Sequence, residues 1–419
     1  MISESNTDKI RKSVSNQSLR ALDCLNIMIG DVLGGLGPYL AAYLRTAQQW
    51  DQASIGAALS AMGIATILSQ TPAGALVDRL KQKRILLCGA AGVMSLACVV
   101  ITVFSQFYAV MTAQIMYGIG AAVAGPCIVA ISLGLVGHKR FASRIARNEA
   151  YNHVGNVVAA VLAGLAGFLI SPICVFYLIA LFGVGSIVAT CFIRESEIDH
   201  DVASGAVEST SSKAEINIAA LLSNKHIAAF AVAVFLFHLS NAAMLPLAGQ
   251  YLSEGRPREA PLWISACVVS AQFVMVPVSL WAGRAAQTWG RKPVFLIGFS
   301  VLPIRGILYT LNSSPFWVVP VQLLDGIGAG IFGVLASVIV ADLTKGTRHY
   351  NVTRGAIITA QGVGAVLSNL LAGFLVARFG YVSGFLFLAL TGLAGLVICC
   401  LGLPETRNLE PELGSFKDG

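Results

Sequence analysis

Charged residues are scarce in this chain. Only 12% of its 419 residues are Asp, Glu, Lys or Arg, while 56% are hydrophobic, and the mean hydropathy is +0.75. A soluble protein carries about 25% charged residues, which cover its surface. The composition therefore excludes a soluble fold and places most of the molecular surface in lipid.

Several sequence motifs of enzymes and metal sites are missing as well. The chain has no G-x-x-x-x-G-K-[ST] phosphate loop, no H-E-x-x-H or G-x-S-x-G motif, and no C-x-x-C pair among its nine cysteines. A G-x-G-x-x-G match at 328–333 lies inside an apolar run with no strand before it, which indicates helix packing. We therefore expect no enzyme activity, no ATP hydrolysis, no metal and no cofactor.

Long apolar runs are what the sequence has in abundance. A membrane-crossing helix needs about 20 predominantly apolar residues. Twelve runs of this kind occur, at 21–44, 53–77, 85–105, 108–136, 149–170, 172–193, 226–251, 261–286, 293–311, 315–341, 354–377 and 379–402. They are rich in Ala, Leu and Gly, which predicts an all-α membrane protein with twelve transmembrane helices.

Lysine and arginine predict the orientation of these spans. The net charge of +7 comes from short basic clusters between apolar runs, a distribution that argues against nucleic-acid binding. Twenty-three of the 28 lysines and arginines fall on one side, four fall on the other, and Arg305 lies within a span. The basic side is the cytoplasmic side in multi-pass proteins, so both termini are predicted to be cytoplasmic.

One acidic, Ser-rich segment at 194–225 divides the spans six and six. We expect a cytoplasmic tail at 1–20, a six-helix bundle at 21–193, a cytoplasmic linker at 194–225, a second bundle at 226–402 and a cytoplasmic tail at 403–419.

The halves also repeat one another. QIMYGIGAAVAG at 114–125 matches QLLDGIGAGIFG at 322–333, Pro38 matches Pro246, and Gly155 matches Gly364, all at offsets of 208 or 209. Such repeats are typical of secondary transporters.

The loop after the second span carries a family signature. GALVDRLKQKRIL at 74–86 resembles the signature loop of the major facilitator superfamily, roughly G-x-L-a-D-R-x-G-R-K-x-x-L. The second half has a copy, GRAAQTWGRKPVFL at 283–296, with Gln287 at the aspartate position, and the PETR sequence at 404–407 resembles an ending common in the superfamily. The residues that we assign to this cytoplasmic gate motif are Gly74, Asp78, Arg79, Lys83, Gly283, Gly290, Arg291 and Lys292.

Asp78 illustrates what such a motif can do. A carboxylate at the end of an inward-running helix can accept hydrogen bonds from the N-terminus of a neighbouring helix, where the helix dipole favours an anion. This contact would latch the two halves at the cytoplasmic side. The alternative is that the basic residues of the loop serve only to orient the chain in the membrane.

The resemblance implies two six-helix bundles related by pseudo-symmetry, with spans one, four, seven and ten lining a central cavity. It places seven polar candidates for substrate or proton binding on these spans: Asp31, Gln114, Tyr117, His238, Asn241, Gln322 and Asp325. Arg305, on span nine, is the remaining charged candidate and a possible partner of an anion. Intramembrane charges are costly and usually functional, and Asp31 and Asp325 each lie ten residues into their spans, near mid-depth.

Structural explanations for these residues stay open at this point. Asp31 could hydrogen-bond a backbone loosened at Gly34, Gly35, Gly37 and Pro38, where the helix is expected to bend or pack closely, as it is at Pro246. Asp325 and Arg305 could form an ion pair between neighbouring spans. His238 could be a packing residue, and Arg305 could extend toward the membrane surface. His153, at the start of span five, is interpreted as an interfacial residue.

We therefore predict a secondary active transporter that moves a small organic solute by alternating access, coupled to protons and functional as a monomer in a bacterial inner membrane. Export of amphipathic compounds or metabolites is favoured, with uptake of an organic anion or a metal chelate as the alternative, and an uncoupled facilitator or a membrane sensor as further alternatives. Two departures from the family count against a simple drug/proton antiporter. Gln114 and Tyr117 replace the Arg and Gln of an R-x-x-Q-G pattern, and span five has no G-P-x-x-G-G motif.

Overall fold

The computed structural model describes residues 14–34, 36–203, 224–344 and 350–407; a few side chains in these ranges, including those of Asp31 and Asp78, lie outside the description. Every regular element in this part of the chain is helical. The first half contains α1 (Asn16–Gly34), α2 (Leu36–Thr46), α3 (Gln52–Arg79), α4 (Lys83–Val103), α5 (Phe107–Leu169), α6 (Cys174–Cys191), the short η1 (Glu195–Glu197) and α7 (His200–Ala203). The second half contains α9 (Lys225–Asn241), α10 (Met244–Ser253), α11 (Ala260–Thr288), α12 (Arg291–Leu311), α13 (Pro315–Leu343), α14 (Tyr350–Phe379) and α15 (Tyr381–Gly402).

The helices confirm the predicted fold class, with two differences in detail. Eleven segments of the described chain are long and apolar enough to cross a membrane, and the twelfth predicted span, 21–44, corresponds to α1 and α2 on either side of residue 35. The loop expected between spans four and five is helical instead. Both spans belong to α5, which turns at Gly137, where φ is 66°. Glycine accepts this left-handed value without a steric penalty.

The helix of the seventh predicted span is interrupted after Asn241. The span predicted at 226–251 consists of α9 and α10, because Pro246 has no N–H to donate to the carbonyl of Ala242. The backbone N–H of Ala243, between α9 and α10, donates to a side chain of another helix, Ser368 Oγ of α14, at 3.0 Å. Irregular backbone at this depth is tolerated where it lies against protein or lines a cavity. Asn241 lies directly at the break.

The repeated glycines pack in equivalent places in the two halves. A Cβ atom at Gly118 of α5 would lie 2.3 Å from the carbonyl oxygen of Met62 in α3, and one at Gly326 of α13 would lie 2.3 Å from that of Ala271 in α11. Real Cβ atoms do not approach so closely, so both positions require glycine for the helices to touch. The sequence repeat is thus a repeat of helix packing.

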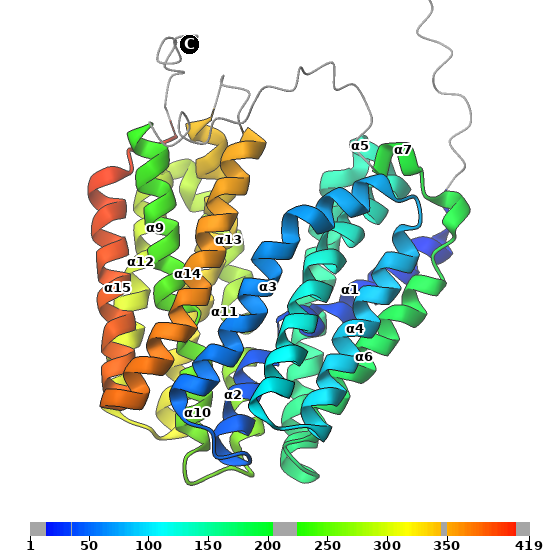
Figure 1. The fold of residues 1–419 in the computed structure, drawn as a ribbon. Helices are drawn as coiled ribbons and strands as arrows, with labels where there is room; N and C mark the ends of the chain where they lie inside the picture. The colour runs from blue at the N-terminus through cyan, green and yellow to red at the C-terminus, as the bar shows by residue number, and fades with distance from the viewer. Residues whose placement is uncertain (1–13, 35, 204–223, 345–349, 408–419) are drawn as a thin grey trace, which may run out of the picture.

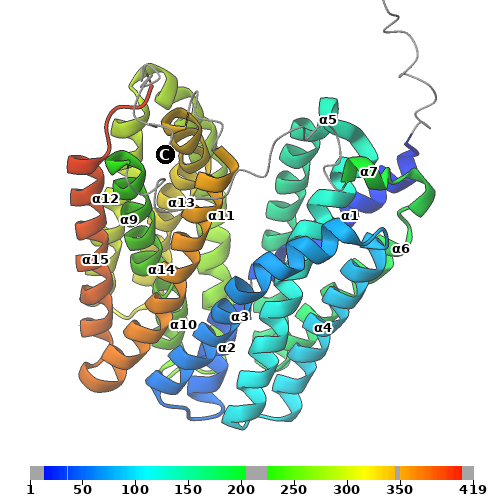
Figure 2. The ribbon, with the colours of Figure 1, turned by 45° about the horizontal axis from the view of Figure 1, so that its top comes forward.

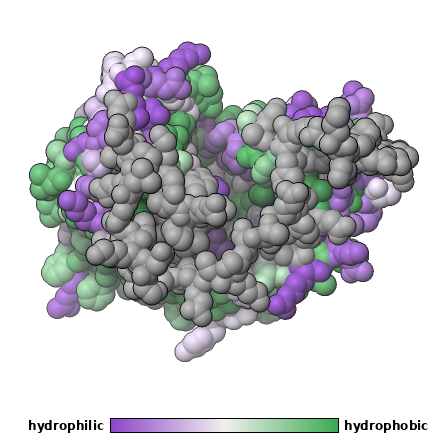
Figure 3. All heavy atoms as spheres, turned by 90° about the horizontal axis from the view of Figure 1, so that it is seen from above, coloured by the Kyte–Doolittle hydropathy of each residue, from purple (hydrophilic) through white to green (hydrophobic). Residues whose placement is uncertain are grey.

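The two halves meet on the side opposite the linker and diverge toward the linker side (Figures 1 and 2). The helices α3 and α14 approach so closely that a Cβ at Gly56 would lie 2.5 Å from the carbonyl oxygen of Asn369. Further along α3, Ile67 lies against Gly362, and beyond this contact the helices separate (Figure 1). Viewed from the linker side, the surface is hollowed between the halves (Figure 3). The described conformation is therefore open on the linker side.

Candidate functional site

A cavity of about 290 Å³ lies between the halves, next to the interruption between α9 and α10. Most of its lining is apolar, and the residues from both halves that line it are Leu33, Leu36, Gly37, Pro38, Leu59, Met62, Tyr117, Asn241, Ala242, Leu245, Pro246, Asp325 and Asn369. Pro38 of the first half and its repeat partner Pro246 of the second half both line this cavity. Among the described side chains of the lining, Asp325 is the one that carries a charge.

Asp325 is held by a buried cation. Arg305 of α12 is 1% exposed and donates to Asp325 Oδ1 through Nη1, to Asn241 Oδ1 at 2.6 Å through Nη2, and toward Met244 Sδ at 3.0 Å through Nε. The guanidinium is thus committed to partners within the second half. The sequence left open whether Asp325 and Arg305 form an ion pair between neighbouring spans, and this is the contact that the structure contains. The expectation that Arg305 extends toward the membrane surface is wrong, because its three partners hold it in the interior.

The network continues away from the cavity. Gln322 lies three residues before Asp325 on α13 and donates to Asp325 Oδ2 at 3.0 Å, as residues three apart on one helix face can. The hydroxyl of Tyr309 in turn donates to Gln322 Oε1. Buried polar groups of this kind are costly unless every partner is present. The carboxylate of Asp325 is therefore positioned by four side chains acting together.

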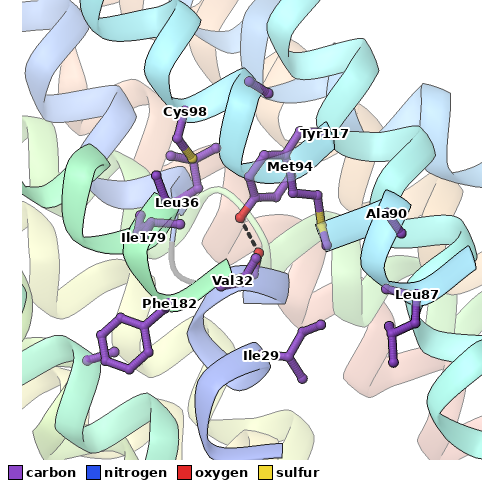
Figure 4. Packing of buried hydrophobic residues seen from close by; sticks show 14 of the residues in the cluster. Ile29, Val32, Leu36, Leu87, Ala90, Met94, Cys98, Tyr117, Ile179 and Phe182 are labelled. Atoms are coloured by element: carbon purple, nitrogen blue, oxygen red, sulfur yellow. Dashed lines mark hydrogen bonds between the residues drawn. The ribbon is translucent and has the colours of Figure 1, made fainter. Parts of the chain in front are cut away.

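The repeat counterparts of Gln322 and Asp325 have different partners. Tyr117 donates its hydroxyl proton to the carbonyl oxygen of Val32 in α1, within the packed core of the first half (Figure 4). Gln114 is fully buried and donates to the carbonyl of Ala58 in α3 at 3.3 Å. Tyr117 lines the cavity, whereas Gln114 does not. Gln114 ties α5 to α3 instead of pointing to the substrate path.

His238 also lies away from the cavity lining. Its ring packs against Phe332 at 4.8 Å and Phe237 at 5.3 Å between ring centroids, and its Nδ1 lies 3.1 Å from the carbonyl oxygen of Val234 on its own helix. These contacts match the alternative of a packing residue. Among the predicted helix-bend residues, Gly35 lies outside the described residues, as do the side chain of Asp31 and that of Asp78 in the gate motif.

In the first gate motif, Lys83 closes the turn between α3 and α4. Lys83 is buried, and its Nζ donates to the carbonyl oxygens of Val77 at 2.9 Å and Leu80 at 3.0 Å. A cation at a helix C-terminus binds the carbonyls that the helix leaves without partners. Gly74 has open space around it, and Arg79 is exposed.

In the second gate motif, Glu405 of the PETR sequence caps α12. Its carboxylate accepts from the backbone N–H of Arg291 at 2.8 Å and of Lys292 at 3.1 Å. Burial alone would raise the pKa of Glu405, but hydrogen bonds from the N–H groups of Arg407, Arg291 and Lys292 outweigh it and lower the pKa. Gly290 precedes the cap with φ of 103°, and a Cβ there would lie 2.3 Å from Glu405 Oε2.

The side chain of Arg291 ties this motif to a neighbouring helix. It forms an ion pair with Asp342 of α13 at 3.3 Å, and its Nη1 donates to the carbonyl of Ala286 at 2.7 Å. Gly283, the first glycine of the copy, has only Val334 within 4 Å of a Cβ placed there. These contacts all stay within the second half in the conformation that is open on the linker side.

The sequence reasoning missed an ion cluster near the linker side of the first half, in which Asp23 and Arg144 are buried and Arg147 is exposed. Asp23 of α1 accepts from Arg144 Nη2 at 2.7 Å and from Arg147 Nη2 at 2.6 Å, both on α5. Arg144 also donates to Asn148 Oδ1 at 2.7 Å, and Asn148 donates to Ser132 Oγ at 2.8 Å. The sequence signal for this cluster was Asp23 at the edge of span one together with Arg144 and Arg147, three residues apart. The two arginines were interpreted only as cations that set the topology.

A second missed contact joins the halves. His153 Nδ1 of α5 lies 3.1 Å from Gln272 Oε1 of α11. The interpretation of His153 as an interfacial residue is therefore incomplete, because its ring bridges the two bundles.

The chain matches one known family over most of its length. The family model of the Major Facilitator Superfamily matches residues 22–271 and 230–417. The chain belongs to the major facilitator superfamily. It is 45% identical over 398 residues to an uncharacterized MFS-type transporter of Mycobacterium tuberculosis, covering 94% of this chain and 95% of that protein. It is 30% identical over 156 residues to the multidrug resistance protein MdtL of Escherichia coli, covering 36% of this chain and 38% of MdtL.

Solved structures support the same fold. The nucleoside transporter NupG superposes with a TM-score of 0.74 at 16% identity and covers 92% of this chain and 98% of its own. The D-xylose-proton symporter superposes with a TM-score of 0.69 at 14% identity and covers 93% and 98%. Within this superfamily the present chain is a multi-pass membrane protein and a transporter.

Proposed function

We propose that this superfamily member exports a small amphipathic organic solute by alternating access in exchange for protons, and that Asp325 carries the proton. The observation behind this proposal is a single described charge, Asp325, in a cavity whose other walls are apolar or uncharged. An amphipathic solute fits such walls, and one carboxylate supplies one titratable group. The similarity of part of the chain to MdtL supports export.

Asp325 can alternate between two electrostatic settings. Beside Arg305 its ionised form is favoured, because an opposite charge stabilises a carboxylate. A rearrangement within the second half that moves α13 against α12 during the transport cycle would weaken this pair and favour the protonated form, since burial disfavours an unpaired charge. Conformation and protonation are then coupled through the strength of the Asp325–Arg305 ion pair. The alternative, uptake of an organic anion at Arg305, has less support because the guanidinium already has three partners.

The test is transport in proteoliposomes with a panel of amphipathic cations, neutral compounds and anions, while internal pH is recorded. We expect solute efflux to drive proton uptake in the wild type. Asp325→Asn should lose the proton flux and keep solute exchange at zero gradient. Asp51→Asn is the matched control, since Asp51 caps α3 outside the cavity and asparagine caps a helix equally well.

Asp31→Asn is tested in parallel, because Asp31 is the second carboxylate predicted at mid-depth. Lost coupling in Asp31→Asn with retained coupling in Asp325→Asn would assign the proton to Asp31. Coupling retained in both variants would contradict proton transport by either residue, and the absence of pH-dependent flux in the wild type would favour a facilitator.

The linker side is proposed to be cytoplasmic, and the membrane to be the bacterial inner membrane, because the basic residues concentrate on that side. In this orientation the gate motif lies at the cytoplasmic mouth, and Asp78 would bind the opposite half when that mouth closes. Asp78→Ala should abolish transport while insertion and abundance stay unchanged. Gln287→Ala, at the matching position of the second half, is the control, and unchanged transport in Asp78→Ala would contradict gating.

A further inference from the structure

A large apolar groove lies on the outside of the first half, away from the central cavity. It has a volume of about 930 Å³ and runs between α1 and α6, with one side closed by Leu162 of α5. Its walls are side chains such as Met28, Leu181, Val188 and Phe192. None of the residues that line it lines the central cavity. It is therefore a separate surface feature, open toward the membrane.

The groove has one polar end, on the linker side. Arg20, Cys24 and Met28 follow one another at intervals of four along the same face of α1, so the cation stands at the mouth of the groove. Within the described chain, the guanidinium of Arg20 has no hydrogen bond or ion pair. Gln17, one turn earlier, also lines the groove and accepts from Arg194 Nη2 at 2.8 Å. Two arginines thus lie at this end.

The acidic groups of the described chain around this end already have other partners. Asp23 pairs with Arg144 and Arg147. Glu197 accepts from Ser15 Oγ at 2.9 Å and pairs with Arg194 at 3.5 Å. Burial alone would raise the pKa of Glu197, but hydrogen bonds from Ser18 and Ser15, together with the charge of Arg194, lower it. Glu197 therefore balances Arg194, and among the described residues no acidic side chain pairs with Arg20.

The groove is long enough to span the hydrocarbon part of one leaflet of a bilayer. On α6 it extends from Leu178 to Phe192, which is about 21 Å at the rise of an α-helix. Half of the hydrocarbon core of a bilayer is roughly 15 Å thick. An acyl chain that enters beside Arg20 would thus find apolar contacts throughout its leaflet.

We propose that this groove is a binding site for one anionic phospholipid of the linker-side leaflet, with an acyl chain along α6 and the phosphate at Arg20. Arginine binds phosphate through two parallel hydrogen bonds, which a zwitterionic headgroup weakens by bringing its own cation. The apolar walls and the cation at their end together favour a lipid over a soluble anion. Because α1 forms one wall, the bound lipid supports the helix that carries Asp23 and Asp31.

The test is native mass spectrometry of the purified full-length protein with phosphatidylglycerol and phosphatidylcholine of identical chains. We expect the wild type to retain phosphatidylglycerol in preference, and Arg20→Gln to reduce its occupancy about fivefold, the effect of one cation near an anionic lipid surface. Val188→Trp, which fills the groove from the exposed face of α6, should also reduce occupancy. Arg378→Gln is the control, because Arg378 is an exposed arginine at the far end of α14.

Competing inorganic phosphate separates a lipid site from a simple anion site. Retained phosphatidylglycerol in millimolar phosphate supports the proposal. Displacement by phosphate, equal retention of the two lipids by the wild type, or an Arg20→Gln variant that binds like Arg378→Gln would each overturn it. The measurement does not depend on transport, so its outcome is independent of the exporter proposal.

Discussion

Gly155 of α5 and Gly364 of α14 occupy equivalent places in the two halves. A Cβ at Gly155 would lie 2.1 Å from the carbonyl oxygen of Ile27 in α1, and one at Gly364 would lie 2.3 Å from that of Phe235 in α9. Ile27 and Phe235 are themselves 208 positions apart. The first helices of the two halves, α1 and α9, are thus held by the same glycine contact in each bundle.

Gly155→Ala and Gly364→Ala are therefore expected to be destabilising. The added methyl group collides with backbone rather than with a flexible side chain, and overpacking of this kind costs about 1–3 kcal/mol. Thermal unfolding in detergent should show a lower midpoint for each variant. Gly125→Ala is the control, because a Cβ at Gly125 has nothing within 4 Å. Equal midpoints for all three variants would show that the helices can move apart without cost.

Breaking the Arg305–Asp325 pair should cost more than replacing it. Arg305→Met leaves Asp325 without its cation, and removing one partner of a buried pair costs about 3–5 kcal/mol. The double variant Arg305→Met with Asp325→Leu removes both charges and should recover most of this loss. Unfolding of the wild type, both single variants and the double variant completes the cycle. A double variant as unstable as Arg305→Met would mean that Asn241 and Gln322, not the charge pair, dominate the network.

Cross-linking the closed side should stop transport. Tyr39 OH of α2 lies 2.8 Å from Ser265 Oγ of α11, across the two halves. In a background without native cysteines, Tyr39→Cys with Ser265→Cys should react with a short cleavable thiol cross-linker and hold this side shut. Solute flux should fall to background and return when the linker is cleaved, whereas Tyr39→Cys alone should be insensitive. Full transport by the cross-linked protein would contradict separation of the halves at this point.

The cap of α12 predicts a pH-dependent contribution to stability. Because the pKa of Glu405 is lowered in the folded protein, its cap is fully present above the ordinary glutamate pKa and is lost as pH falls through the folded value. Glu405→Gln should lower stability near neutral pH by about 0.3–1 kcal/mol, the worth of an anion at a helix N-terminus. The difference from the wild type should shrink in acid. A difference that is constant with pH would mean that the carboxylate charge is not involved.

Much of the fold could be predicted because its signals are local. Apolar length defined the spans, and Pro246 indicated where one of them is interrupted. The helix that continues after the turn at Gly137 was missed because many of its first residues are polar. A polar stretch between two spans predicts a loop. The gate motif was found by its pattern, but the role of Glu405 as a cap depends on a residue 114 positions after Arg291.

The candidate site was predicted less completely. Of the predicted residues, Asp325, Asn241 and Tyr117 line the cavity, whereas Gln114, Gln322 and His238 do not. A helix presents several faces, and the position of a residue along the span does not say which face meets the cavity. For Asp23 and Arg144 the sequence showed two charges at span edges, 121 positions apart, and no local pattern connects them.

The order of amino acids alone was enough to establish that this chain crosses a membrane as helices in two related halves, because hydropathy and repeat spacing act along the chain. Which charges meet depended on the packing of the helices in three dimensions. Packing paired Asp325 with Arg305, joined His153 to Gln272 across the halves, and closed the side opposite the linker. These contacts require particular helix rotations and tilts, which are set by segments far apart in sequence.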